Sequence, residues 1–445
     1  MNEQAYIHLY NEFSQEIRDN SVAILNRGRD EAFEQFQKQG FPSKKDEAYQ
    51  YCNLPEKLSG EYGVNIKRLQ FQLEREDIFR CNILSINSIL AYTINDNFYI
   101  PENQKSKLPD GVIFCSLAEA EKNYPEIVQK YLFRQSQKAD DGFVSFNSTF
   151  VQNGYFLYIQ KDTRLEKPLQ LINILRAATA LMTFSHNLIV VESGAAAKLL
   201  ICGHVVDNVE FFSSHVTEIF VEENAIFDYY DLEESSNKTA RHSALFTEQA
   251  ADSNVIINGV TLTNGISRND YHINLNGDRA ETVLCGMAIQ DTEQQVDTFT
   301  HITHSVPHCK SLELFKNVLS GNSLGAFSGR ILVAEGADKT EAYQTNRNMC
   351  LTREARMYSK PQLEIYADDV KCSHGMTTGQ LDEQALFYMQ SRGLSSNEAK
   401  TLLSIAFTSD VIEKVRLESL KDRLHLLVDK RFRGEPMLCA NCEVS

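Results

Sequence analysis

A cysteine and a histidine in the last third of the chain, Cys372 and His374, are the two side chains best suited to bind iron. Val370, Cys372 and His374 alternate with polar residues, so an extended strand would place all three on one face. A thiolate and a neutral imidazole are both ligands for iron or for an iron–sulfur cluster. We expect Gly375 to turn the chain sharply and leave the imidazole accessible at a rim. A buried cysteine beside a hydrogen-bonded histidine is the simpler alternative.

A second group of candidate ligands has the spacing of a helical zinc site and comprises His301, His304, His308 and Cys309. These residues lie in sequence that is patterned as strand and interrupted by Pro307. Helical spacing therefore does not bring them together, and we expect them to be structural.

A single Cys-x-x-Cys pair, Cys439 and Cys442, stands near the C-terminal end of the sequence. A structural zinc site needs four ligands, and no second pair is nearby. A thioredoxin-like redox motif needs a βαβ setting, which the surrounding sequence does not provide. We expect no essential role for this pair.

Three basic residues, Lys316, Lys339 and Arg347, could together bind an anionic group, although such residues are ordinarily solvated at the surface.

Motifs of nucleotide chemistry are missing from the sequence. It has no Gly-x-x-x-x-Gly-Lys-Ser/Thr phosphate loop and no Gly-x-Gly-x-x-Gly after a strand, which argues against an ATPase. It also has no Gly-x-Ser-x-Gly nucleophile elbow.

The composition is that of a folded, acidic chain. The formal net charge is −16 over 445 residues, which repels phosphate backbones and argues against a nucleic-acid partner. The ten cysteines have no framework spacing, which indicates reduced thiols in the cytoplasm. Residues 1–13 lack the apolar core of a signal peptide, and no apolar run is long enough to span a membrane. We therefore expect a cytoplasmic protein without a membrane partner.

The pattern of apolar residues divides the chain into regions. Residues 1–100 are predicted to be mainly helical, and residues 101–110 form a polar connection flanked by prolines. Residues 111–378 contain many short runs of β-branched and aromatic residues, which predict strands. Residues 382–432 return to a helical pattern, and the tail 434–445 is expected to be loose.

The strand region contains a weak internal repeat. Taking Ala195, Ala225, Val255 and Ala280 as equivalent points gives spacings of 30, 30 and 25 residues. Such a period fits one coil of a β-solenoid, in which each coil buries a face shared with the next. An antiparallel sandwich with long strands explains the pattern as well. For the solenoid we expect Ile256 and Leu284 to face inward.

The helical region 382–432 is expected to carry a docking surface. Asp382 can cap its first helix, Gly393 can end it, and Ser395 with Glu398 forms a capping box for the next. Two apolar stripes follow, one of Leu402, Leu403, Ala406 and Phe407 and one of Leu420, Leu424 and Leu427. One solenoid end cannot cover both stripes, which leaves apolar surface for a partner.

Long blocks of this sequence resemble one known family. These blocks are Gly40–Glu47, Pro307–Ser311, Phe327–Ile331, Lys339–Asn348 and Lys360–Val370, together with the segment from Ala367 to Ser396. The resemblance is dense between about residues 301 and 415. The chain is similar to the SufD family, scaffold subunits of the SUF (SufBCD) machine that assembles iron–sulfur clusters.

The resemblance implies a right-handed parallel β-helix core between N-terminal and C-terminal helical domains. It implies a non-catalytic scaffold that pairs with SufB through the β-helix and holds the SufC ATPase through the C-terminal helices 382–432. It places iron or the nascent cluster at the SufB interface, beside His374 and with less weight Cys372. Reduced flavin belongs to the assembled complex of this family, and the chain alone could form a homodimer.

Two positions distinguish this chain from the sister subunit SufB, as the resemblance implies. SufB carries a catalytic cysteine after the glutamine that matches Gln344, where this chain has Thr345. SufB also has a glutamate after the histidine that matches His374, where this chain has Gly375. The sulfur-accepting cysteine is therefore expected on the partner.

The alternative hypothesis is a β-helix polysaccharide lyase or hydrolase, because many parallel β-helices have such activities. Its catalytic carboxylates would be Asp291, Glu293 and Asp297. Such enzymes are usually secreted, and no export signal is evident in the sequence.

Overall fold

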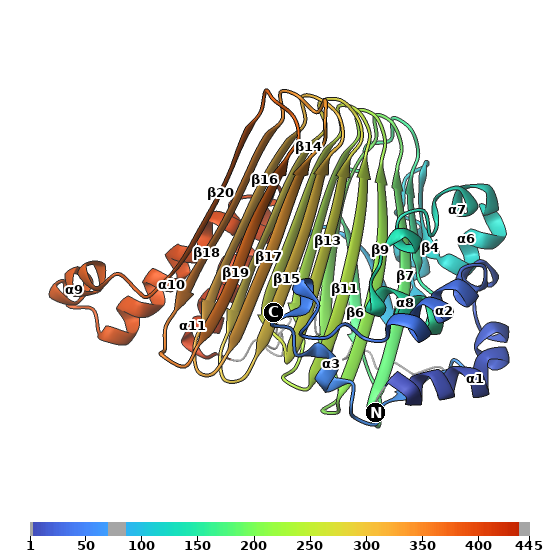
Figure 1. Cartoon of the computed structure of the whole chain (residues 1–445), viewed down its shortest axis with the longest axis horizontal. Helices are drawn as coiled ribbons and strands as arrows, with labels where there is room; N and C mark the ends of the chain where they lie inside the picture. Colours follow the sequence, from blue (N-terminus) through green and yellow to red (C-terminus); the bar gives the residue numbers. More distant parts are fainter. Residues whose placement is uncertain (1–2, 70–85, 436–445) are drawn as a thin grey trace.

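The structure is a computed structural model that describes residues 3–69 and 86–435. Its core is a parallel β-helix in which the chain alternates between two ten-stranded sheets (Figure 1). From β7 to β18, each strand pairs in parallel with the strand two before it and the strand two after it. The predicted β-helix is thus confirmed, and the antiparallel sandwich is wrong.

Each sheet carries alternate strands of the chain. In spatial order the first sheet contains β19 Arg356–Ile365, β17 Leu324–Val333, β15 Gln295–His304, β13 Ile266–Leu275, β11 Thr239–Gln249, β9 Phe211–Val221, β7 Leu181–Val191, β5 Tyr155–Ile159 and β4 Val112–Ser116, with the short β1 Gly63–Val64 paired to β7. The second sheet contains β20 Lys371–Gly379, β18 Glu341–Cys350, β16 Lys310–Leu319, β14 Glu281–Gln290, β12 Asn254–Thr263, β10 Ile226–Glu234, β8 Ala196–Val205, β6 Leu169–Leu175, β2 Ile89–Ile94 and β3 Asn97–Tyr99.

In the strands of the middle coils, every second residue points into the interior of the β-helix. Leu284 lies inside, as predicted. The prediction for Ile256 is wrong, because this side chain packs outward with the C-terminal helices while Val255 and Ile257 occupy the interior. Strand β12 is apolar on both faces since a helix covers its outer side, so alternation could not show which face is inward.

Successive coils stack at a shared corner, where one residue per coil has a positive φ. These residues, with φ between 56° and 60°, are Asn224, Asp252, Arg279, His308 and Lys339. Asn and Asp tolerate this left-handed conformation better than other residues with a Cβ, which explains two of the five. The buried residue that follows each corner produces the repeat seen in the sequence. In register, the residue equivalent to Ala225 and Ala280 is Ser253, so the choice of Val255 was wrong by two positions.

N-terminal helices cover the first sheet at the start of the solenoid (right in Figure 1). Helix α8 is buried along its whole length between α1, α2 and strands β7 and β9. Helices α6, α7, η3 and α8 lie inside the range 111–378, where strands were expected. Strands β1, β2 and β3 lie inside the range 1–100, which was predicted to be mainly helical. The helical elements are α1 Glu3–Asp19, η1 Ala23–Asn26, α2 Arg29–Gln39, η2 Glu47–Tyr49, α3 Leu54–Lys57, α5 Glu102–Lys105, α6 Leu117–Asn123, α7 Pro125–Tyr131, η3 Ser136–Lys138 and α8 Gly142–Phe150.

The segment around η2 crosses the outer face of the first sheet as far as β19. Buried Arg268 donates to the backbone oxygen of Ala48 at 2.6 Å and to Asp297 at 2.7 Å. Farther along, the rings of Tyr51 and Tyr358 stack with centroids 3.8 Å apart. The N-terminal region is therefore fixed to the late coils as well as to the early ones.

The C-terminal helices are α9 Glu383–Ser391, α10 Ser396–Ile412 and α11 Glu418–Arg433. Helices α10 and α11 cover the outer face of the second sheet, whereas α9 buries no residue and projects away from it (far left in Figure 1). Asp382 caps α9 and Ser395 caps α10, as predicted. Within residues 3–69 and 86–435, no helix is both long and apolar enough to cross a membrane.

We predict that Leu424→Ala lowers the free energy of unfolding by about 2–5 kcal/mol, because it leaves a cavity between α11 and the sheet. Leu424 is 2% exposed, whereas Leu426 on the same helix is 46% exposed. Leu426→Ala is therefore the matched control and should change stability by less than about 0.5 kcal/mol. Urea unfolding measures both, and equal effects would mean that α11 does not pack as described.

Candidate functional site

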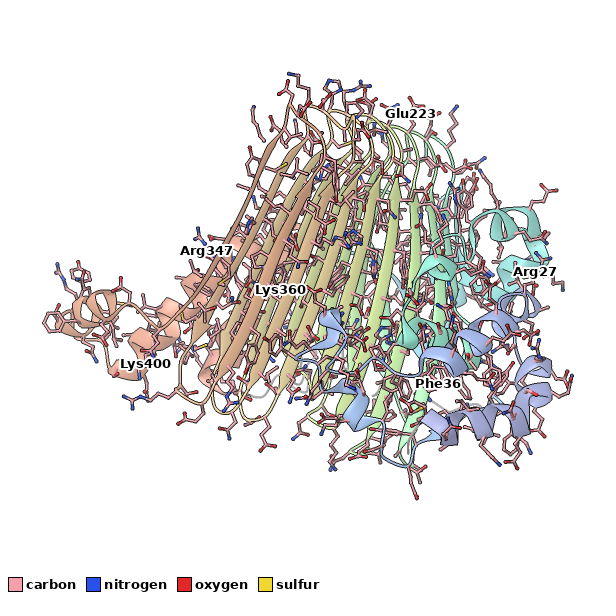
Figure 2. All side chains as sticks on the ribbon, in the orientation of Figure 1. Arg27, Phe36, Glu223, Arg347, Lys360 and Lys400 are labelled. Carbon is pink, nitrogen blue, oxygen red and sulfur yellow. The ribbon has the colours of Figure 1, made fainter. Side chains whose placement is uncertain are left out.

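The β-helix ends in two strands that have a neighbour on one side only, β19 in the first sheet and β20 in the second. Their outer backbone N–H and C=O groups have no strand partner within the described chain. Large apolar side chains are exposed on or beside this last coil, namely Tyr343, Ile365, Tyr366 and Met376. Arg347 and Lys360 also lie near this open end (Figure 2). An uncovered pair of sheet edges with apolar side chains is suited to pairing with another sheet.

His374 lies on β20 and faces the interior side of the solenoid. Its register partner is Gln344 on β18, which is buried inside. His374 is itself exposed, because no further coil covers β20. Its imidazole is therefore the accessible nitrogen donor at the open end.

Cys372 lies on the same face of β20 but in a different environment. It pairs with buried Ala342 and packs against the interior apolar cluster. Burial raises the pKa of its thiol, which disfavours the thiolate that a metal needs. Of the two candidate side chains, His374 is the more accessible.

The turn expected at Gly375 does not exist. Strand β20 continues from Lys371 to Gly379, and Gly375 pairs with Thr345 in regular register. A glycine with no positive φ can stand in a strand like any other residue. The accessibility of His374 comes from the end of the sheet and not from a turn.

A chain of buried polar side chains leads inward from Gln344. Gln344 Nε2 donates to Glu313 Oε2 at 2.8 Å, and the hydroxyl of Thr300 donates to Glu313 Oε1 at 2.5 Å. Glu313 is fully buried, and desolvation raises the pKa of its carboxyl to about 7. Sequence reasoning missed this group, although an acid inside the apolar run Leu312–Phe315 was a signal.

The other histidine candidates do not converge. His301 lies on the outer face of β15, and His304 lies inside, where its Nε2 is 2.9 Å from the hydroxyl of Ser311. His308 is a corner residue that pairs with Asp278, and the Cys309 thiol donates to the Gly277 oxygen. Among the described residues, no group of three or more His, Cys, Asp or Glu could hold a metal ion. Cys439 and Cys442 lie outside the described residues.

The predicted basic cluster does not form. Lys316 is buried and donates to the Phe407 backbone oxygen and to Asp410, so it holds α10 on the sheet. Lys339 sits at a corner and pairs with Asp369, while Arg347 is exposed on β18. Lys316 and Arg347 are neighbours in register, but Lys339 is not part of the group. No anion site results from these three residues.

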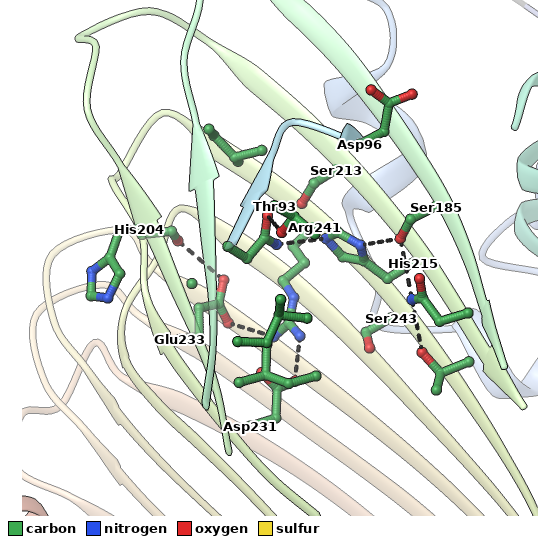
Figure 3. Close-up of a pocket in the computed structure, with 18 of the residues that line it drawn as sticks. Thr93, Asp96, Ser185, His204, Ser213, His215, Asp231, Glu233, Arg241 and Ser243 are labelled. Atoms are coloured by element: carbon green, nitrogen blue, oxygen red, sulfur yellow. Dashed lines mark hydrogen bonds and ion pairs between the residues drawn. The ribbon is translucent and has the colours of Figure 1, made fainter. Parts of the chain in front are cut away.

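A polar chamber lies inside the earlier coils (Figure 3). Arg241 pairs there with Asp231 and Glu233, and Ser185 lies 2.7 Å from Nδ1 of His215. Desolvation lowers the pKa of His215 to about 3, which keeps its imidazole neutral. Arg241 offsets one of the two carboxylates and desolvation raises the pKa of Glu233, so these groups form a buried, internally paired network. The spacing of these residues in the sequence gave no sign of it.

Comparison with known proteins identifies the family. Residues 173–407 match the SufBD core domain of SUF-system FeS cluster assembly, and residues 1–171 match the SufBD N-terminal region. The chain belongs to the SufBD family. It is 26% identical over 408 residues to the iron–sulfur cluster assembly protein SufD of Escherichia coli, covering 90% of this chain and 92% of that protein.

Other relatives cover the chain in the same way. An iron–sulfur cluster assembly SufBD family protein of Synechocystis is 27% identical over 416 residues, covering 88% of this chain and 87% of that protein. SufD of Bacillus subtilis is 25% identical over 332 residues, covering 73% of this chain and 74% of that protein. The resemblance to SufD seen in the sequence motifs is confirmed.

We predict that Glu313 makes stability fall as pH rises. Its folded-state pKa of about 7 lies above the ordinary glutamate value of 4.5, so between these values the unfolded chain loses a proton that the folded chain keeps. The contribution of protonated Glu313 to the free energy of unfolding is fully present below pH ~4.5. Up to about 3 kcal/mol of this contribution is lost by pH ~7. Urea unfolding at several pH values should show a steeper fall for the wild type than for Glu313→Gln, and parallel curves would contradict the burial of an ionisable acid.

Proposed function

We propose that this chain is a non-catalytic scaffold subunit of a SUF complex that assembles iron–sulfur clusters. The observation that carries the proposal is the open end of the β-helix, where His374 is exposed on an unpaired edge strand. Family membership supports the same role. One accessible imidazole beside one half-buried thiol makes an incomplete metal site, so the remaining ligands come from a partner.

SufB is the proposed partner at the open end. Strands β19 and β20 offer two rows of backbone donors and acceptors, and pairing with the edge strands of a second β-helix would satisfy them. Tyr343 and Met376 add apolar area to this surface. A second copy of this chain is the alternative occupant when SufB is absent.

Iron and sulfide are the cargo that this arrangement handles. A neutral imidazole can donate an electron pair to iron, and the pairing of two edges would place His374 at the junction. Thr345 stands where SufB is expected to carry its cysteine, so persulfide sulfur arrives from the partner and not from this chain. Cys372 contributes less, since its thiol is half-buried and its pKa is raised. Reduced flavin belongs, in this proposal, to the assembled complex.

The SufC ATPase is the proposed partner of the C-terminal helices. The stripe of Leu420, Leu424 and Leu427 is buried against the second sheet and is therefore unavailable. Helix α9 instead exposes Phe387 and Tyr388, at 72% and 58%. Exposed neighbouring aromatic side chains of this kind are typical of interaction surfaces. The docking surface is thus narrower than the whole region 382–432 and centres on α9.

The three carboxylates required by the polysaccharide lyase or hydrolase alternative are not arranged as a catalytic group. Asp297 is buried in an ion pair with Arg268, and Asp291 pairs with Arg431 of α11. Glu293 lies exposed in a turn between β14 and β15. No pair of free carboxylates faces a groove at these three positions, which disfavours glycoside chemistry.

We predict that His374→Ala leaves folding and complex formation intact but lowers the iron and sulfide content of the purified complex several-fold. The side chain is exposed, so its removal costs little stability, while no alanine atom can bind iron. Complementation of cells that lack the endogenous subunit gives the physiological readout.

Cys372→Ala is the matched control on the same strand face and should be milder. If the His374→Ala complex retains wild-type iron and sulfide, His374 is structural and the assembly site lies on the partner alone.

We predict that Phe387→Ala with Tyr388→Ala weakens SufC binding at least about tenfold, because the pair forms the apolar centre of the proposed surface. SufB pairing should be unchanged, since α9 projects away from the β20 edge strand. Tyr99→Ala is the control, because Tyr99 is 54% exposed, close to Tyr388, and lies on β3 at the opposite end of the second sheet from β20. Calorimetric titration with SufC decides the point, and undiminished affinity would move the docking site to α10 or α11.

A further inference from the structure

Gln344 is the buried polar side chain closest in register to His374. The two residues are paired neighbours on β18 and β20 and lie on the same, interior face. Gln344 is 1% exposed, and its amide nitrogen donates to Glu313 on β16, on the side away from β20. Its amide oxygen is buried and accepts no hydrogen bond. A buried carbonyl oxygen without a donor is costly, so its persistence needs an explanation.

The hydrogen bond to Glu313 fixes which end of the amide is free. Because the nitrogen already donates to an oxygen of the Glu313 carboxyl group, the amide oxygen is the atom left to accept from another group. Gly329 on β17 makes room for this arrangement, since a Cβ there would lie 2.4 Å from the Gln344 nitrogen. Glu313 also accepts from the Thr300 hydroxyl, so the two hydrogen bonds converge on its carboxyl group and hold it in place.

We propose that Gln344 is a positioning residue for His374, whose ring N–H donates to the free amide oxygen of Gln344 while the other ring nitrogen binds iron. Histidine ligands of metals ordinarily donate their second nitrogen to a carbonyl or carboxylate, which fixes the tautomer and the ring orientation. The adjoining chain Gln344–Glu313–Thr300 supplies that acceptor and keeps it from rotating. This inference rests on the proposed function, since it assigns His374 to metal binding.

The test measures cobalt(II) binding, as a spectroscopic substitute for iron, to the full-length chain in its assembled complex. Gln344→Leu removes the acceptor and should weaken cobalt(II) binding by about 10–100-fold, the usual cost of losing such a partner. Gln290→Leu is the matched control: Gln290 is also 1% exposed, also inside the solenoid, and also has an unpartnered amide oxygen. It should leave cobalt(II) affinity unchanged while lowering stability to a similar extent.

A charge-exchange variant separates positioning from packing. In Gln344→Glu with Glu313→Gln, the new amide accepts from Thr300 and donates to the new carboxylate, which retains an oxygen for His374. Cobalt(II) affinity should return to within about threefold of the wild type, with the same absorption spectrum. A purely structural role predicts no selective loss in Gln344→Leu relative to Gln290→Leu.

The outcomes distinguish this inference from the proposed function. If His374→Ala abolishes cobalt(II) binding and Gln344→Leu does not weaken it, the positioning role is wrong and the proposed function stands. If folded Gln344→Leu loses affinity but the exchange variant does not recover it, the acceptor is not what Gln344 supplies, and the inference fails. If His374→Ala itself binds cobalt(II) as the wild type does, the proposed site fails and the positioning role fails with it.

Discussion

In-register parallel stacking is the constraint on which the rest of this structure depends. Each coil hydrogen-bonds to the coil before it and to the coil after it, so every backbone group is satisfied only where another coil follows. Helices α8, α10 and α11 cover outer faces, but none of them supplies the missing neighbour of β19 or β20. Where the stacking ends, the last two strands are therefore left with unpaired backbone groups and uncovered side chains. The exposed imidazole of His374 and the two unpaired edges have this same origin.

The interior of the solenoid is not uniformly apolar. An apolar core in the manner of Val255, Ile257 and Leu284 would be sufficient for stability. Glu313 instead lies fully buried at a cost that its raised pKa reflects, and only two side-chain hydrogen bonds offset it. Natural sequences usually depart from locally favourable choices where function requires it. Glu313 lies on β16, two strands inward from β20 in the same sheet, and is linked through Gln344 to the open end.

The sequence predicted more of the fold than of the site, for physical reasons. Period-two alternation and the approximate repeat identify strands and coils, and capping residues such as Asp382 and Ser395 identify helix starts. Alternation fails where both faces are apolar, which is why Ile256 was assigned to the wrong side. Helix α8, as apolar as a strand, was not separable from the strands around it. Contacts between coils cannot be read from the sequence. Glu313, for example, bonds to Thr300 and Gln344, which are 13 and 31 residues away along the chain.

The proposed site, with one accessible ligand, would couple metal binding to assembly. His374 alone cannot hold iron firmly, since stable sites need several donors, and Cys372 is disfavoured as a thiolate. Pairing of β20 with a partner edge would add the missing ligands at the moment when the backbone groups are satisfied. Coupling between two binding events is reciprocal. If pairing raises the affinity for iron by some factor, iron raises the affinity of the pairing by the same factor. A scaffold built as we propose would complete its site only in the complex, and the free chain would have too few ligands to bind metal firmly.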